Sequence, residues 1–258
     1  MKLKFSSLFC LLLVLASCND STSDEFDGAN PDAIAKYIET VSVISAQDNS
    51  ENTLITVNYD ANDRVSSITD GTESSLFVYS NNELTNVTGD GDNLNVEELY
   101  ESPYNAFETG EVTEYDANGN PKIISFIEYE YDFLTDTETE VEYTAEISYD
   151  ANPNPYFYTL DAAGVIDVLD NVDLILTVNM SSAEAVQARL LFPLNNITGI
   201  TYRDNNANLV FEINADYVYN DANYPTSGTV TGTSYDEDFN GEPETETNIY
   251  SVAYTYRD

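Results

Sequence analysis

The fold class is decided by one short stretch of sequence, VEYTAEISY, which runs from Val141 to Tyr149. Its apolar residues stand at every second position and alternate with Glu, Thr and Ser. A period of two predicts a β-strand with one apolar and one wet face, which is typical of antiparallel sheet. The same alternation recurs in residues 127–133, 211–219 and 250–256. We therefore predict a mainly β protein.

A recurring turn sequence separates these strands. It reads Tyr-Asp-Ala-Asn from Tyr59, Tyr115 and Tyr149, with looser copies from Tyr79, Tyr202 and Tyr219. An Asp that begins a turn accepts hydrogen bonds from backbone N–H groups ahead of it, and Asn and Gly tolerate the left-handed backbone that reverses a chain. Each copy therefore predicts a hairpin turn. Residues 36–258 are expected to form a single domain, an antiparallel meander of hairpins that makes an open or partly closed barrel-like sheet.

One or two short helices are expected to interrupt the strands. Residues 181–184, Ser-Ser-Ala-Glu, have the spacing of a capping box, and Pro193 follows the apolar segment after them. This spacing predicts a helix over residues 182–191. Residues 162–169 fit either a second short helix or a loop that packs over a sheet end.

The first residues are typical of a bacterial export signal. A short basic region precedes the apolar run Leu8–Ala16, which is too short to span a bilayer. The run ends in Leu15-Ala16-Ser17-Cys18, which resembles a bacterial lipobox. The resemblance implies that residues 1–17 are a signal peptide that is removed and that Cys18 carries a lipid anchor. A plain secretory signal with an incidental cysteine is the alternative.

The residues after Cys18 bear on location. Asn19 follows the cysteine, and by resemblance to enteric lipoproteins this favours the outer membrane, on either its periplasmic or its cell-surface face. Residues 18–35 are predicted to be an acidic flexible tether, because residues 21–31 are polar and have no hydrophobic period. The acidic residues Asp24, Glu25 and Asp27 fit either a surface-export signal or a solvated tether.

Charge and composition exclude several function classes. The chain has 258 residues, with 47 Asp and Glu against 8 Lys and Arg, no His, and a formal net charge of −39. So acidic a chain repels nucleic-acid phosphates and anionic lipid headgroups, and without His it has no Ser-His-Asp or Cys-His catalysis. The acid excess fits a solvated surface better than a site for a basic partner.

The turns also carry a family resemblance. The Tyr-Asp-Ala-Asn turns resemble the YD repeats of Rhs-type proteins. Together with residues 192–198, Phe-Pro-Leu-Asn-Asn-Ile-Thr, and with Tyr217–Asn220 leading to Tyr224-Pro225, the layout is similar to a family of Gram-negative lipoproteins of unknown function with a porin-like fold. The resemblance covers residues 36–258. It implies an open or partly closed antiparallel sheet and no particular activity.

The sharpest local motif is a candidate calcium loop at residues 236–241. Its sequence, Asp-Glu-Asp-Phe-Asn-Gly, matches the first half of an EF-hand loop, in which carboxylate and amide oxygens surround one hard cation. An ordinary Asx-rich hairpin turn is the alternative. The candidate ligands are the side chains of Asp236, Asp238 and Asn240, the backbone carbonyl of Glu242, and Glu246 in place of the missing terminal Glu.

These observations predict a role but not a ligand. We expect an outer-membrane lipoprotein that acts as a non-enzymatic binding or structural module at the cell envelope, with a glycan or a protein as its ligand. The alternative is a carboxylate-based glycan hydrolase. The regularly spaced tyrosines could stack on sugars, but tyrosine at a period of two is more often packed within a sheet.

Overall fold

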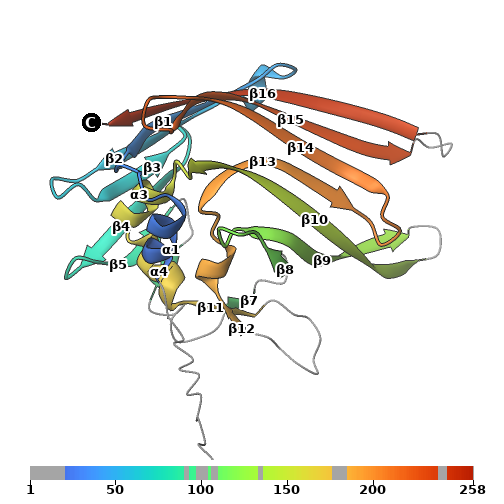
Figure 1. The fold of residues 1–258 in the computed structure, drawn as a ribbon, viewed down its shortest axis with the longest axis horizontal. Coiled ribbons are helices and arrows are strands. Elements are labelled where there is room, and N and C mark those ends of the chain that lie inside the picture. The colour runs from blue at the N-terminus through green and yellow to red at the C-terminus, as the bar shows by residue number, and fades with distance from the viewer. Residues whose placement is uncertain are drawn as a thin grey trace, which may run out of the picture.

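The computed structural model describes residues 21–89, 93–96, 104–105, 110–132, 136–175, 185–237 and 243–257. A single antiparallel sheet of 13 strands dominates this part of the chain. The predicted fold class, mainly β with an open barrel-like sheet, is confirmed. Figure 1 shows that the sheet is strongly curved, and three short α-helices of the described chain lie on its inner side.

The strands run through the described chain as follows. They are β1 (Tyr37–Ser45), β2 (Thr53–Tyr59), β3 (Val65–Thr69), β4 (Ser74–Ser80), β5 (Glu83–Thr88), β6 (Asn93–Asn95), β7 (Tyr104–Asn105), β8 (Glu111–Tyr115), β9 (Pro121–Asp132), β10 (Thr137–Pro153), β11 (Asp173–Ile175), β12 (Ala185–Gln187), β13 (Asn195–Arg203), β14 (Leu209–Tyr219), β15 (Pro225–Glu237) and β16 (Pro243–Arg257). Their order in the large sheet is β6-β5-β4-β3-β2-β1-β16-β15-β14-β13-β10-β9-β8, and a small sheet has the order β12-β11-β7.

The large sheet consists of two meanders that meet at one strand pair. β1 lies antiparallel to β16, from Tyr37 opposite Arg257 to Ser45 opposite Tyr250. One arm continues from β1 to β6 and the other from β16 to β8. Within the described residues β6 and β8 each have one neighbour only, so the sheet stays open.

Five of the six predicted turns are hairpin turns. They join β2 to β3, β4 to β5, β8 to β9, β13 to β14 and β14 to β15. The copy that starts at Tyr149 is not a turn, because β10 runs on through it to Pro153. In the turns at 60–64 and 116–120 the fourth residue has a positive φ, 62° at Asp63 and 89° at Gly119. Pro153 occupies that position in the Tyr149 copy, and proline cannot adopt a positive φ.

The helix predicted over residues 182–191 is wrong where the structure describes it. Residues 185–187 form β12, which pairs with β11 through Leu174 and Val186, and residues 188–191 form the 3₁₀ helix η3 (Ala188–Leu191). Ala188 is buried in a cluster with Val172 and Leu174. Packing against β11 therefore overrides the local helical pattern. The capping-box residues 181–184 lie outside the described part.

The segment around residues 162–169 is helical, one of the two outcomes that its sequence allowed. It contains the end of α3 (Phe157–Ala162) and most of α4 (Val165–Asn171). Gly164 joins the two helices with a φ of 74°, a backbone conformation that glycine adopts without strain. A further 3₁₀ helix, η1 (Asn49–Glu51), connects β1 to β2.

The prediction of a flexible tether is wrong for residues 22–29, which form α1 (Thr22–Ala29). Ser21 and Asp24 make a capping box at its start. Phe26 is completely buried and stacks on Phe157 with ring centroids 3.6 Å apart. Burial of one aromatic ring stabilises an otherwise polar helix, so the folded domain begins before residue 36. Asp24 caps this helix together with Ser21, and Glu25 forms an ion pair with Arg189 of η3, so neither lies on a solvated tether.

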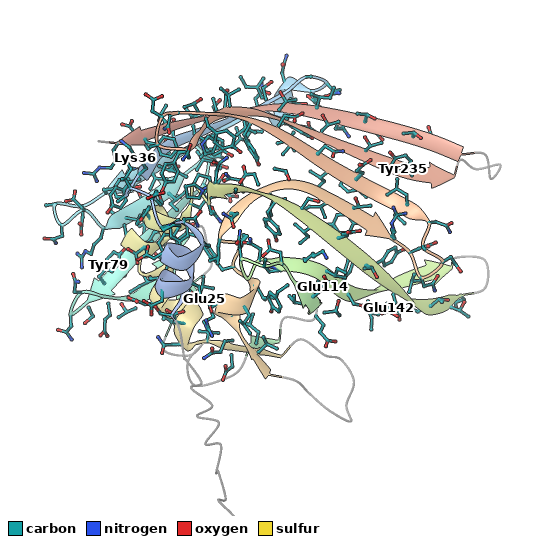
Figure 2. The ribbon with its side chains drawn as sticks, in the orientation of Figure 1. Glu25, Lys36, Tyr79, Glu114, Glu142 and Tyr235 are labelled. Carbon is teal, nitrogen blue, oxygen red and sulfur yellow. The ribbon has the colours of Figure 1, made fainter. Side chains whose placement is uncertain are left out.

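The core lies between the inner face of the sheet and the helices. Ile38, Val41, Val57 and Val252 come from β1, β2 and β16, and they pack against Ala163 at the end of α3. Side chains are crowded in this region in Figure 2, which labels Glu25 on α1. Among the described residues no helix combines the length and the apolar character needed to cross a membrane.

Candidate functional site: the fork between β13 and β14

Two neighbouring strands of the large sheet separate at one end. β13 and β14 pair from Arg203 opposite Leu209 to Gly199 opposite Asn214, and no further. Beyond this point β13 pairs only with β10 and β14 only with β15. In Figure 1 the first part of β13 curves away beneath β14. We call this region, residues 195–198 of β13 and 215–219 of β14, the fork.

Side chains bridge the fork where the backbone ladder is missing. The Tyr217 hydroxyl donates to the Ile197 carbonyl oxygen over 3.2 Å, and the Tyr219 hydroxyl donates to the Asp150 carboxylate. Burial raises the pKa of both tyrosines, so their hydroxyls remain protonated donors at neutral pH. The first bond joins β14 to β13 and the second joins β14 to β10, so the separation at the fork is fixed.

Asp150 is the centre of the polar contacts at the fork. Its carboxylate accepts hydrogen bonds from the Asn152 backbone N–H at 2.9 Å and from the Asn196 side-chain amide at 3.1 Å, besides that from Tyr219. Both carboxylate oxygens are therefore occupied by groups of this chain. Such an arrangement fixes the position of the side chain.

Two cavities lie on either side of Tyr217. The larger has a volume of about 500 Å³ and is lined by Asp150, Asn152, Thr198, Asn214, Ala215, Asp216, Tyr217 and Tyr219. The smaller has a volume of about 140 Å³ and is lined by Asn154, Pro155, Tyr156, Pro193, Asn195, Asn196, Ile197, Tyr217 and Tyr254. No basic residue lines either cavity.

One buried polar atom at the fork lacks a partner. Asn196 has an exposed fraction of 4%, and its amide nitrogen is bonded to Asp150. Its amide oxygen makes no hydrogen bond with any described residue. Burying an acceptor in this way costs about 1–3 kcal/mol. Asn196 belongs to the lining of the smaller cavity, and a buried polar atom without a partner calls for an explanation.

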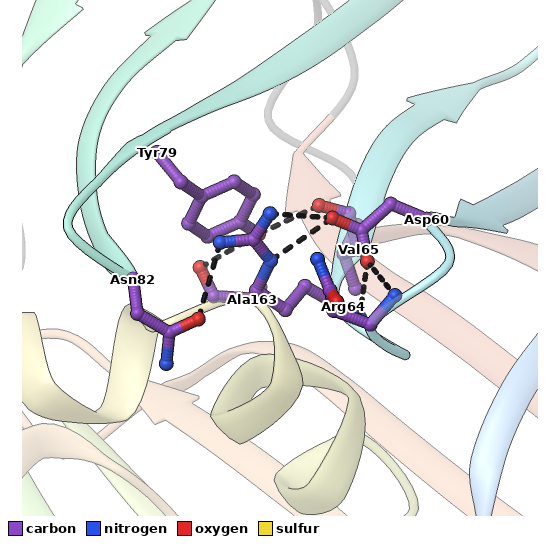
Figure 3. Close-up of polar contacts among 7 residues, drawn as sticks. Asp60, Arg64, Val65, Tyr79, Asn82 and Ala163 are labelled. Atoms are coloured by element: carbon purple, nitrogen blue, oxygen red, sulfur yellow. Dashed lines mark hydrogen bonds and ion pairs between the residues drawn. The ribbon is translucent and has the colours of Figure 1, made fainter.

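A second polar cluster, around Arg64, is structural. The Arg64 guanidinium donates to Asp60 at 2.6 Å and to Asn82 at 3.3 Å and lies over the Tyr79 ring (Figure 3). The Tyr79 hydroxyl donates in turn to Val65 and Ala163 carbonyl oxygens. These contacts tie two hairpin turns to the end of α3, and their partners are groups of this chain.

A buried amide network behind the fork also has its partners within the chain. The Asn120 side-chain oxygen accepts from the backbone N–H groups of Leu194 and Asn195. The Asn195 amide donates to Asn30 and to the Asn152 carbonyl oxygen. The network connects α1, β10 and β13, and so fixes the position of residues 195–196 at the fork.

The predicted calcium ligands are only partly within the described residues. Asp236 lies near the end of β15 opposite Glu244, and Glu246 lies in β16 opposite Ser234. Asp238, Asn240 and Glu242 lie outside the described residues, as does Cys18. Among the described residues there is no group of three or more side chains suited to a metal ion. The calcium site and the lipid anchor stay predictions.

The sequence contained a weak signal for the fork. Its tyrosines and Asn195-Asn196 belong to segments that carry the family resemblance, but period-two alternation gives no reason to expect two strands to separate. The one local sign is the Tyr149 copy of the turn sequence, where prolines replace the residues that a hairpin turn needs.

The comparison with known proteins finds similar structures but no similar sequence. No protein family matches the sequence, and no curated protein is significantly similar to it. A porin-like protein from Bacteroides uniformis matches with 11% identity and a TM-score of 0.32, over 85% of this chain and 98% of that one. A porin-like protein from Bacteroides vulgatus matches with 13% identity and a TM-score of 0.37, over 86% and 99%.

Proposed function

We propose that this chain is a lipid-anchored protein of the bacterial outer membrane, and that it binds a small polar ligand in the fork without transforming it. The observation that carries the binding role is the unpaired, buried amide oxygen of Asn196, a residue that lines the smaller cavity. Rigid side chains around a cavity with an unmet acceptor are typical of a preformed binding site.

A binding role fits the site better than catalysis. Of the carboxylates that line the larger cavity, Asp150 has both oxygens engaged by neighbouring donors. A general acid or base needs an oxygen within reach of the reacting group. The predicted glycan-hydrolase alternative requires two such carboxylates, so it needs a rearrangement of Asp150.

Ligand-observed NMR with a library of small polar molecules tests the binding role. At least one compound is expected to bind the wild-type protein and to lose its signal with Asn196→Leu. The control is Val218→Thr, because Val218 belongs to the β14 part of the fork but is 61% exposed and lines neither cavity. If no compound distinguishes the two variants, the fork is not a binding site. Conversion of a bound glycan to shorter products would support the hydrolase instead.

The anchor has a separate test. Cys18→Ala is expected to release the protein from the membrane fraction, because the lipobox cysteine supplies the acyl chains. Cell fractionation followed by detection of the protein measures this. A variant that stays with the outer membrane would contradict the anchor without bearing on the fork.

A further inference from the structure

We infer that the ligand of the fork is a neutral polyhydroxylated molecule, a monosaccharide or the end of a glycan chain. This inference rests on the proposed binding role of the fork. It follows from the hydrogen-bonding capacity of the cavity walls, from their charge, and from the tyrosine rings beside them.

The walls call for a ligand that both donates and accepts hydrogen bonds. The unpaired oxygen of Asn196, which lines the smaller cavity, needs a donor. Thr198, Asn152 and Asn214, on the wall of the larger cavity, carry hydroxyl and amide groups that can donate as well as accept. A hydroxyl group meets both needs in one atom, whereas an ammonium group donates only. Several hydroxyls on one ring therefore match the walls best.

The charge of the cavity walls excludes anionic ligands and contributes little to the binding of cationic ligands. No Lys or Arg lines the cavities, whereas Asp150 and Asp216 do, so a phosphate or carboxylate would be repelled. The oxygens of Asp150 are already engaged by Tyr219, Asn196 and Asn152. A cation would therefore pair with Asp216, which is exposed, and ion pairs in contact with water contribute little. The remaining class is a neutral polar ligand.

The tyrosine rings supply the apolar part of the site. Tyr217 and Tyr219 lie on the same side of β14, with ring centroids 6.2 Å apart and planes at 61°. Both hydroxyls are bound to groups of this chain, which fixes the rings in place. A fixed ring can pack against the C–H face of a sugar ring at little cost in side-chain entropy. The larger cavity, at about 500 Å³, lies within the usual size range of ligand pockets.

Isothermal titration calorimetry with three probes tests the ligand class. The probes are the neutral disaccharide cellobiose, the diamine putrescine and the anion glucuronate. Cellobiose is expected to bind, with an affinity that does not change between low and moderate NaCl, because neutral ligands are not screened. Glucuronate is expected not to bind, and putrescine is expected to give only weak heat that disappears with salt.

Two variants test whether cellobiose binds at the fork. Asn196→Leu and Thr198→Val each remove a hydrogen-bonding group, and each is expected to weaken cellobiose binding about tenfold. Val218→Thr is the matched control and is expected to leave it unchanged. Thr198→Val keeps the shape of the side chain, so it remains informative if Asn196→Leu fails to fold.

The outcomes separate the ligand class from the binding role. If putrescine binds tightly, cellobiose does not, and Thr198→Val abolishes the putrescine signal, the ligand class is wrong and the fork remains a binding site. If cellobiose binds equally well to all variants, sugar binding lies elsewhere and the inference fails. If no probe and no library compound binds at the fork, the inference and the proposed function both fail.

Discussion

Tyrosine hydroxyls in this protein bind the backbone carbonyl that directly follows a hairpin turn. Tyr79 donates to Val65 at 2.6 Å, Tyr149 to Pro121 at 2.6 Å and Tyr256 to Pro225 at 2.7 Å. The preceding turns are residues 60–64, 116–120 and 220–224. Each tyrosine thus connects its own strand to the end of another hairpin. This shared role explains in part why the chain uses 20 tyrosines.

Loss of one such hydroxyl should destabilise the protein. Tyr149→Phe keeps the ring and leaves the partly buried Pro121 carbonyl without its donor, at an expected cost of about 1–2 kcal/mol in the free energy of unfolding. Urea denaturation measures it. Tyr250→Phe is the matched control, because the Tyr250 hydroxyl bonds to the exposed Glu51 carboxylate, and its expected cost is below about 0.5 kcal/mol. Equal costs would contradict the role.

Buried tyrosines should make the protein sensitive to alkali. Burial raises the pKa of Tyr79 from 10.0 to about 12, and it raises the pKa of Tyr149, Tyr254 and Tyr256 as well. A group whose pKa is higher in the folded state stabilises the fold below its unfolded pKa, and this contribution is lost as pH rises through the folded pKa. The urea midpoint should therefore fall from about pH 10 upward. A flat midpoint between pH 10 and 12 would refute this.

At the scale of the element, one turn geometry is used four times. In the turns that start at Asp60, Asp116, Asp204 and Asn220, the first side chain accepts from the N–H groups two and four residues ahead. The fourth residue has a positive φ in each case: Asp63, Gly119, Ala207 and Asn223. Ala207 differs from the other three residues in its type, because alanine adopts this conformation only at a cost of about 1–2 kcal/mol.

Exchanging alanine and glycine at this position should act in opposite directions. Ala207→Gly is expected to stabilise the protein by about 0.5–1 kcal/mol, because glycine relieves the backbone strain. Glycine also raises the conformational entropy of the unfolded chain, and this offsets part of the stabilisation. Gly119→Ala is expected to destabilise it by about 1 kcal/mol. A β-carbon at Gly119 meets only Leu194, at 4.0 Å, so its cost comes from the backbone. Chemical denaturation of both variants measures this, and a shift of the same sign in both would contradict it.

The β15–β16 hairpin carries the calcium prediction. Its register places Asp236 opposite Glu244, and like charges directly across a strand pair are destabilising. Calcium binding with a dissociation constant of about 10⁻⁴ to 10⁻³ M is expected, with a rise in melting temperature at millimolar calcium. The control carries both Asp236→Ala and Asp238→Ala. If wild type and control respond alike, the loop is an ordinary hairpin turn.

The sequence predicted local elements well where a single side chain decides them. Asp60, Asp116 and Asp204 mark real turns, because capping by Asp and a tolerant fourth residue are local effects. The predicted helix is wrong for residues 185–191, because Val186 and Ala188 are placed by packing with Val172 and Leu174, in and beside another strand. In the same way Phe26 makes a helix of a segment that is polar by composition.

For the whole molecule, salt should stabilise the fold. A net charge of −39 makes the surface repel itself in the compact state. Ions screen this repulsion within a Debye length of about 10 Å at 0.1 M salt. The melting temperature should therefore rise from low to moderate NaCl, as measured by circular dichroism. A midpoint that is flat or falls over this range would contradict the prediction.

The arrangement of strands was predictable only in part. Hairpin turns between neighbours in sequence imply meanders, and the meanders are present. Nothing local in β1 or β16 indicates that Val43 lies opposite Val252. The fork was likewise outside the reach of sequence patterns, because it depends on where β13 stops following β14. The site therefore follows from long-range pairing, which periodicity does not encode.

The pairing of β1 with β16 has a consequence for the time at which the protein can fold. β16 is synthesised after every other described strand, yet it lies in the middle of the sheet. Until it emerges, β1 and β15 each have one unpaired edge, and the two arms of the sheet are not joined. Pairing of such distant segments is slow, and exposed edges invite association with other chains. A nascent chain therefore completes its sheet only after residue 257 is available.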